Sequence, residues 1–238
     1  MVEVSIIIPT RNEEIALSRL LNSLQSQSYK DYEVIIADYQ SKDNTVKTAK
    51  KYKCKIVKGG LPSKGRNNGA KAAKGNLLLF MDADAILEKG SLKRLLEEFM
   101  ERNLDCGSAL LKPLEGMPID YVLHWLWNGW AFLTQWFYPH GTGAFILCKK
   151  DVFEKVHGFD EGIKVGEDHN FVMKVKDYEY KYRILNKSFV RISVRRFEAE
   201  GRLKVVGKII SMGFYRTFIG EVRKDYFDYN FEYRKKTP

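Results

Sequence analysis

The sequence Asn76-Leu77-Leu78-Leu79-Phe80-Met81-Asp82-Ala83-Asp84 is an apolar run that ends in two carboxylates one residue apart. Such a run predicts a buried strand, and the carboxyl end of a strand is where an α/β sheet presents groups to a ligand. In an extended chain residues i and i+2 point to the same side, so Asp82 and Asp84 are candidates to face a divalent cation or the phosphates that it carries. The alternative is a polar turn that caps the next helix.

Strands and helices are predicted to alternate in the part of the chain that leads to this run. Apolar or β-branched runs predict four strands, at residues 4–8, 32–37, 54–57 and 76–81. Pro9 is expected to end the first of them. Helical spacing and capping residues predict helices from residue 10 to about 24, over 45–52 and over 88–102. Residues 59–69 are expected to be a flexible segment that leads into a short helix. This alternation predicts a mostly parallel sheet with helices on both faces.

The second part of the chain carries further, shorter signals. Strands are expected at residues 106–111, 182–185 and 189–192, and helices at 151–156 and from 166. The glycines within 139–147 would allow close approach of the backbone to a ligand. Residues 121–138 hold all four tryptophans. For that segment we leave open a membrane span, a helix buried in the core or at a dimer contact, and an aromatic platform for an acceptor.

The composition fits one sizeable folded unit of 238 residues with 45% hydrophobic content. The three cysteines are far apart and form no Cys-x-x-Cys pair, so neither a disulfide framework nor a zinc site is indicated. The first residues lack the basic region and the cleavage site of a signal peptide, and we therefore expect a cytoplasmic protein.

The formal net charge of +10 points to a nucleic acid, an anionic membrane or a phosphorylated substrate as partner. From Arg191 onward there are twelve Lys and Arg against six Asp and Glu, so most of the excess lies in the last fifth of the chain. Apolar residues there recur at helical spacing, at Leu203, Val206, Ile210, Phe214 and Phe218. A basic amphipathic helix of this kind either lies on an anionic bilayer or packs its apolar stripe on the rest of the protein.

Six short motifs occur in one order along the chain. They are Ile-Ile-Ile-Pro-Thr-Arg-Asn-Glu at 6–13, Asp38-x-x-Ser-x-Asp-x-Thr45, Gly65-Arg-Asn-x-Gly69, Asp82-Ala-Asp84, Gly158-Phe-Asp-Glu161 and Glu167-Asp168. In this order the chain resembles the family 2 glycosyltransferases of the GT-A fold, over roughly residues 4 to 175. The resemblance implies an inverting transfer of a sugar from a nucleoside-diphosphate sugar.

The resemblance also implies roles for single residues. Asp38 would contact the base, the Asp-x-Asp would carry Mn²⁺ or Mg²⁺ on the diphosphate, and Asp168 of the Glu167–Asp168 pair would be the catalytic base. A divalent ion acts there as a Lewis acid, because the leaving diphosphate gains negative charge as the bond to the sugar breaks. We expect Asp84 to be the direct metal ligand and Asp82 to contact the ribose or a metal-bound water.

The remaining nucleotide-sugar contacts are expected from residues of the first motif and from three arginines: Pro9, Thr10, Arg11, Glu13, Arg66, Arg195 and Arg196. Arg66 either contacts a phosphate or braces its own loop. The paired Arg195 and Arg196 either assist the leaving group or form surface ion pairs.

The expected architecture is a GT-A type α/β fold with a mostly parallel sheet. We expect a nucleotide-sugar-binding half at 1–112, an acceptor and catalytic half of the same domain at 113–200, and a basic amphipathic helical tail at 201–238. The boundary follows from a change of composition at residues 113–118, where two prolines and a glycine occur.

The function expected from the sequence is transfer of a sugar from a UDP or GDP sugar to a hydroxyl of an acceptor sugar or a lipid-linked acceptor. The alternatives are a nucleotidyltransferase and a non-catalytic protein that binds nucleotide sugars or nucleic acid. Nucleic acid is not expected as a partner, because the basic excess lies beside an apolar stripe and not among stacking aromatics. A homodimer, and peripheral binding to the cytoplasmic face of a membrane, stay open.

Overall fold

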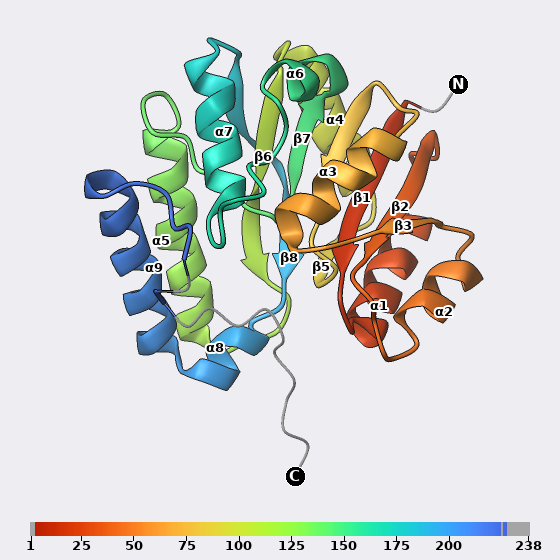
Figure 1. The fold of residues 1–238 in the computed structure, drawn as a ribbon, viewed down its shortest axis with the longest axis horizontal. Helices are drawn as coiled ribbons and strands as arrows, with labels where there is room; N and C mark the ends of the chain where they lie inside the picture. The colour runs from red at the N-terminus through yellow and green to blue at the C-terminus, as the bar shows by residue number, and fades with distance from the viewer. Residues whose placement is uncertain (1–2, 225, 228–238) are drawn as a thin grey trace.

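The protein is described by a computed structural model that covers residues 3–224 and 226–227. A single sheet of eight strands in the order β3-β2-β1-β4-β7-β6-β8-β5 runs through the molecule, and helices pack on it (Figure 1). The strands are β1 Val4–Thr10, β2 Tyr32–Asp38, β3 Lys55–Lys58, β4 Leu77–Phe80, β5 Ala85–Leu87, β6 Cys106–Pro113, β7 Ile146–Lys149 and β8 Tyr182–Ile192. The helices are α1 Glu14–Gln25, α2 Thr45–Lys51, α3 Pro62–Ala72, α4 Ser91–Glu101, α5 Pro118–Thr134, α6 Lys150–Lys155, α7 Glu167–Asp177, α8 Arg195–Glu200 and α9 Arg202–Phe218.

The sheet is parallel in its first half and mixed in its second. Strands β1, β2, β3 and β4 all run parallel. Strand β7 runs antiparallel to β4 and β6, and β5 runs antiparallel to β8. The α/β fold with a helix-covered sheet is therefore confirmed, and the parallel pairing expected from the alternation holds up to β4.

Two apolar cores lie on opposite faces of the sheet. Successive residues of β1 alternate between them, because Ile6 and Ile8 belong to one core and Ile7 to the other. The leucines of α1 and α4 cover the first face, and apolar side chains of α3, α6 and α7 cover the second. This two-sided burial explains why β1 and β4 are apolar at nearly every position.

The prediction that Pro9 ends the first strand is wrong. Pro9 lies inside β1 and pairs in register with Ala37 of β2. The carbonyl of Ile7 accepts a hydrogen bond from the Met81 amide, so residue 9 presents its backbone to the same side as Ile7. Pairing between β1 and β4 has ended there, and the missing N–H of proline leaves no ladder bond unmade.

Residues 59–69, expected to be flexible, mostly form helix α3. Pro62 lies in its first turn, a position that suits proline. Gly69 lets the helix approach β1 closely, because a Cβ at that position would lie 2.3 Å from Cγ2 of Ile7. Two other predicted boundaries also change: residues 182–192 form one strand with an irregularity opposite Ala109 and Leu110, and helix α4 begins at Ser91.

The two aromatic and apolar helices α5 and α9 lie at one edge of the molecule (Figure 1). Their first turns are joined, because Arg202 donates two hydrogen bonds of 2.7 Å to Asp120. Among the residues described, no helix has the length and apolar character needed to cross a bilayer. The tail predicted at 201–238 begins as the helix α9, and residues 225 and 228–238 lie outside the described residues.

The close packing of α3 on β1 predicts the effect of a single methyl group. Gly69→Ala should lower the free energy of unfolding by about 1–3 kcal/mol, because the added Cβ forces α3 away from Ile7. Urea unfolding at neutral pH measures the change. Gly129→Ala in α5 is the matched control, because a Cβ there meets nothing within 4 Å, and it should be neutral or stabilising by up to about 1 kcal/mol. Equal effects of the two substitutions would contradict this packing argument.

Candidate active site

Most of the residues predicted to bind a nucleotide sugar lie at the carboxyl ends of the parallel strands. Thr10 is the last residue of β1 and Pro9 precedes it, Asp38 is the last residue of β2, and Asp82 follows β4. Parallel strands bring these ends to one edge of the sheet, and this edge is where open α/β sheets bind ligands. Pro9 faces α3, because a Cβ on Gly65 would lie 3.1 Å from the Cβ of Pro9.

Asp38 lines a cavity of about 320 Å³. Thr10 Oγ1 donates to its carboxylate at 3.2 Å, and the Ser41 amide donates to it at 3.0 Å. The guanidinium of Arg11 lies 4.7 Å from the ring centre of Tyr39, which also lines the cavity. A planar base fits a cavity with an aromatic wall and a fixed carboxylate at one end. Further lining comes from Lys58, Lys64 and Glu161, and of these the sequence indicated only Glu161.

The buried Arg66 joins two parts of the site that are distant in sequence. Its Nη1 donates to Glu167 Oε1 at 2.6 Å, and its Nη2 donates to Asp82 Oδ1 at 2.8 Å. Arg66 is only 2% exposed, and these two carboxylates compensate its charge. The side chain of Arg66 links the end of β4 to the start of α7 and does not brace a loop of its own, and its contact with a phosphate stays a prediction.

Asp168 is held in the first turn of α7 by two backbone amides. Gly143 N and His169 N each donate to its carboxylate at 2.8 Å. Burial raises the pKa of Asp168 above its ordinary value, and the charge of Arg66 opposes that rise. Burial likewise raises the pKa of Glu167 against the effect of Arg66. A carboxylate with a raised pKa at a fixed position is suited to accept a proton.

Gly143 lies between Asp168 and the Asp-x-Asp segment. A Cβ at this position would lie 2.3 Å from Arg66 Nη2 and 2.8 Å from Asp82 Oδ2. The same residue donates its amide to Asp168. The glycine-rich segment was expected to approach a ligand, and the structure shows that its backbone approaches the acidic residues themselves.

The chain from Asp82 to Asp84 is not extended, contrary to the expectation from the sequence. Residues 83 and 84 form a turn, and the two carboxylates have different partners. Asp82 pairs with Arg66, whereas Asp84 Oδ2 lies 3.4 Å from Nη2 of Arg195. The turn leads into strand β5 and not into a helix, so the alternative of a helix cap is wrong as well.

Arg195 connects Asp84 to the first motif. It donates to both carboxylate oxygens of Glu13, at 2.6 and 2.7 Å, across 182 residues of sequence. Burial raises the pKa of Asp84 to about 6, the charge of Arg195 opposes the rise, and the charges of Asp82 and Glu13 add to it. Arg196 instead pairs with Glu200 at 3.3 Å. The sequence treated the two arginines as equivalent, but in the structure Arg195 lies among the candidate site residues and Arg196 pairs within helix α8.

The donor set around Asp84 fits a divalent ion that is also held by phosphates. Within residues 3–224 and 226–227, no group of three or more His, Cys, Asp or Glu is arranged to hold a metal by itself. Magnesium sites on nucleotides need only one or two carboxylates, because the phosphates and water complete the shell. Asp84 is 25% exposed at its side chain and has like charges nearby, a situation that a cation would relieve.

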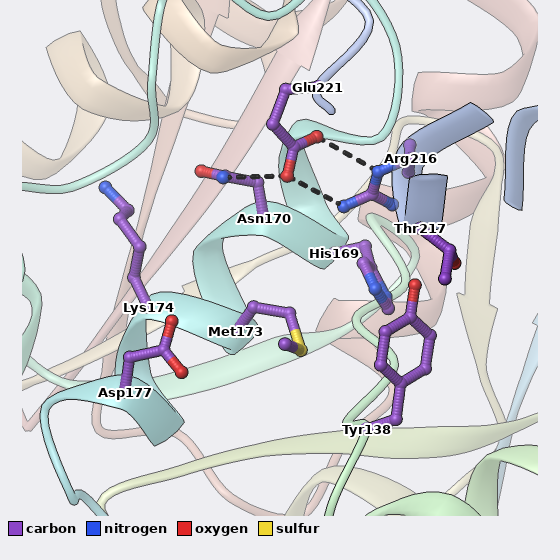
Figure 2. A pocket seen from close by; sticks show the side chains of 9 residues that line it. All are labelled: Tyr138, His169, Asn170, Met173, Lys174, Asp177, Arg216, Thr217 and Glu221. Carbon is purple, nitrogen blue, oxygen red and sulfur yellow. Dashed lines mark hydrogen bonds and ion pairs between the residues drawn. The ribbon is translucent and has the colours of Figure 1, made fainter. Parts of the chain in front are cut away.

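The segment after α9 is attached to the helix that carries Asp168, a connection that no sequence signal indicated. Figure 2 shows the carboxylate of Glu221 between Arg216 and Asn170, at the edge of a second cavity of about 300 Å³. Arg216 Nε and Asn170 Nδ2 each donate to it at 3.0 Å. Val222 forms a bridge with Val165, directly before Gly166. The end of the described chain therefore supports the loop that leads into α7.

Two histidines pack behind Asp168. The rings of His140 and His169 lie 4.9 Å apart, and Tyr138 contacts both. Burial, followed by the charge of Arg216, lowers the pKa of His140 to about 4 and that of His169 to about 2. Both imidazoles are therefore neutral in the folded protein at physiological pH.

This neutral pair predicts a loss of stability in weak acid. In the unfolded chain histidine titrates near pH 6.5, so the unfolded state binds more protons below that pH and stability falls from about pH 6.5 toward 4. Each imidazole contributes up to about 1.4 kcal/mol per pH unit. We expect His169→Phe to reduce the slope between about pH 7.5 and 5.5 in urea unfolding. Tyr138→Phe, which keeps both imidazoles, should retain the slope of the parent, and an unchanged slope in His169→Phe would refute the assignment.

Comparison with known proteins supports the same family as the motifs. A family model described as glycosyl transferase family 2 matches residues 5–157. The poly(ribitol-phosphate) β-N-acetylglucosaminyltransferase TarS of Staphylococcus aureus is 32% identical over 129 residues, which are 50% of this chain and 22% of that protein. A GalNAc(5)-diNAcBac-PP-undecaprenol β-1,3-glucosyltransferase of Campylobacter jejuni is 33% identical over 42% of this chain and 36% of its own length. The chain thus spans about a fifth to a third of these relatives.

Solved structures show the same fold. TarS 1–349 in complex with UDP-GlcNAc superposes with a TM-score of 0.65 at 21% identity, over 97% of this chain and 76% of that one. The mannosyltransferase PcManGT of Pyrobaculum calidifontis, in complex with GDP-Man and Mn²⁺, superposes with a TM-score of 0.67 at 18% identity, over 88% and 64%. The expected GT-A fold is confirmed by this likeness. Because the family model covers more than half of the chain, the protein belongs to glycosyl transferase family 2.

Proposed function

We propose that the protein is an inverting glycosyltransferase that moves a sugar from a nucleoside-diphosphate sugar to a hydroxyl of an acceptor, with the help of a divalent metal. The observation that carries this proposal is the position of Gly143, whose backbone lies against Asp82 and donates to Asp168. The candidate base thus lies close to Asp82. This closeness supports a site in which the base and the diphosphate act on the same sugar, as a single displacement with inversion requires.

In this proposal Asp168 takes the proton of the attacking hydroxyl. The hydroxyl oxygen forms a bond to the anomeric carbon while the bond from that carbon to the diphosphate breaks, and the proton moves to the carboxylate. The two amide donors fix the carboxylate, and burial raises its pKa. Glu167 is bound to Arg66 and therefore acts by positioning its neighbour.

The leaving diphosphate is expected on the side of Asp84 and Arg195. When bound there, Mn²⁺ or Mg²⁺ would be held by Asp84 and would supply Lewis-acid stabilisation of the charge on the diphosphate. Asp82 would contact the ribose or a metal-bound water, and the guanidinium of Arg195 adds positive charge next to Asp84. The fold neighbour that binds GDP-Man and Mn²⁺ supports metal use.

The donor and the acceptor follow from the relatives and the cavity at Asp38. We infer a UDP or GDP sugar, because the fold neighbours bind UDP-GlcNAc and GDP-Man and the cavity at Asp38 has the size and aromatic wall for a base. A lipid-linked acceptor is suggested by the relative named for an undecaprenol-linked substrate. The same proposal includes transfer at a membrane surface. It also assigns nucleotide-sugar binding to residues 1–112, and acceptor binding and catalysis to residues 113–200.

Removal of the proposed base should abolish transfer without abolishing donor binding. We expect Asp168→Asn to lower the rate of nucleoside-diphosphate release with acceptor by about 10²–10⁴-fold, because an amide cannot accept the proton. Thermal shift with the donor should remain. The matched control is Asp151→Asn, since Asp151 also lies in the first turn of a helix but is exposed. Equal activity of both variants would show that Asp168 is only a helix cap.

Removal of the proposed metal ligand Asp84 should weaken the part of UDP or GDP binding that depends on Mn²⁺. In the parent protein Mn²⁺ should increase the thermal stabilisation given by UDP or GDP, and Asp84→Asn should remove most of that increase, because an amide is a poor ligand for a hard cation. Titration of Mn²⁺ by electron paramagnetic resonance provides a second readout. Glu88→Gln is the control, because Glu88 pairs with Arg191 on the surface. A Mn²⁺ response that survives in Asp84→Asn would exclude Asp84 as the ligand.

A further inference from the structure

Helix α9 presents its apolar side to solvent and its charged side to the protein. Arg202 pairs with Asp120, Lys208 pairs with Glu200, and Arg216 pairs with Glu221. The opposite side is apolar and exposed, with Leu203 at 90%, Ile210 at 55%, Phe214 at 62% and Phe218 at 76%. A surface helix normally buries its apolar side, so this orientation is the reverse of the expected one. Of the two alternatives left by the sequence, packing of the stripe on the domain is wrong for these four side chains.

Helix α5 extends the exposed apolar surface with aromatic side chains. Trp125 is 72% exposed, Trp130 56% and Leu133 72%, and Trp136 follows the helix at 64%. The first turns of the two helices are joined through Arg202 and Asp120, and both helices lie at the same edge of the molecule (Figure 1). We call the exposed apolar side chains of α5, of α9 and of the residues just after α5 the α5–α9 face. Apolar surface gathered in this way on two adjacent helices marks an interaction site.

The charges of the α5–α9 face select its partner. Asp120 is the only carboxylate in the sequences of the two helices, and it is buried and paired with Arg202. Within α5 and α9 themselves, the charged side chain that is exposed is basic, Lys204. Tryptophan and phenylalanine among apolar residues, with basic but no exposed acidic side chains, match the interface of a bilayer with negative headgroups. Two copies of a chain with a net charge of +10 would repel each other.

We propose that the α5–α9 face docks on the surface of an anionic lipid bilayer, with the aromatic side chains at the level of the headgroups. The docking lets the active site reach an acceptor held in that bilayer. This second statement rests on the proposed function, whereas the docking itself does not.

The α5–α9 face is connected to the candidate base by a short chain of ring contacts. The ring of Trp130 lies 6.3 Å from that of His140, and His140 lies 4.9 Å from His169, the neighbour of Asp168. On the α9 side, Glu221 accepts hydrogen bonds from Arg216 of α9 and from Asn170 of α7, the helix that also carries Asp168. Docking through this face would therefore hold Asp168 close to the headgroup layer, where the hydroxyl of a lipid-linked acceptor lies.

Sedimentation of the intact protein with vesicles tests the proposal. We expect binding to vesicles of phosphatidylcholine with phosphatidylglycerol, and weaker binding to phosphatidylcholine alone. Phe214→Gln with Phe218→Gln should weaken the partition coefficient by about tenfold or more, because two exposed aromatic rings no longer enter the interface. Lys204→Gln should weaken binding about fivefold on the anionic vesicles only. Quenching of tryptophan fluorescence by brominated lipids should accompany binding, since Trp125, Trp130 and Trp136 lie on the α5–α9 face.

Matched variants separate docking from general stickiness and from misfolding. Ile15→Gln with Met100→Gln removes two apolar side chains that are 73% and 57% exposed outside the α5–α9 face, and it should bind vesicles as the parent does. Trp125→Gln with Leu133→Gln repeats the test on α5. A cooperative thermal unfolding transition like that of the parent confirms that each variant is folded.

Three results would overturn the proposal. They are no binding of the parent to anionic vesicles, binding that both pairs of face variants retain, and a dimer in sedimentation velocity that these variants convert to monomer without any vesicle binding. The last would assign the α5–α9 face to a second copy of the chain. Vesicle binding without any transfer activity would refute the proposed function and leave the docking intact, and transfer to a soluble acceptor without vesicle binding would do the reverse.

Discussion

A buried guanidinium organises the candidate site. Arg66 comes from helix α3, and its charge is compensated by Asp82 after β4 and Glu167 at the start of α7. Loss of one partner of a buried ion pair costs about 3–5 kcal/mol, because the other charge stays in a medium of low polarity. The fold therefore holds the three segments together, and Asp168 occupies its position as the residue next to Glu167.

A second ion cluster reaches the site from helix α8. Arg195 of α8 binds both oxygens of Glu13 and lies near Asp84. Asp84 therefore lies near the guanidinium of Arg195 and the carboxylates of Asp82 and Glu13. Burial raises the pKa of Asp84 to about 6, Arg195 opposes the rise, and the two carboxylates add to it. The site thus has two distinct regions: a cluster in which the buried Arg66 pairs with two carboxylates, and Asp84, next to which a metal on a diphosphate would add positive charge.

Ion pairs also fix the edge formed by α5 and α9, where they hold a helix whose apolar side is exposed. The paired charges of α9 face inward and fasten it to α5, to α8 and, through Glu221, to α7. Its apolar side is left for a partner. In the proposed docking, α9 would therefore connect the lipid surface, through Glu221, to the helix that carries Asp168.

Hydrophobic patterns in the sequence were enough to predict the parallel strands of the first half, because buried parallel strands are apolar throughout and their polar residues concentrate at the carboxyl ends. The order of six short motifs was enough to predict the family. Three features depended on tertiary structure: the different partners of Asp82 and Asp84, the separate fates of Arg195 and Arg196, and the outward turn of the stripe of α9. Each is set by contacts between residues far apart in the chain, such as the 182 residues between Glu13 and Arg195. The local sequence predicts strands and helices and shows which charged side chains are available. The rotation of a helix about its axis and the choice of ion-pair partners are decided only when segments distant in sequence pack together.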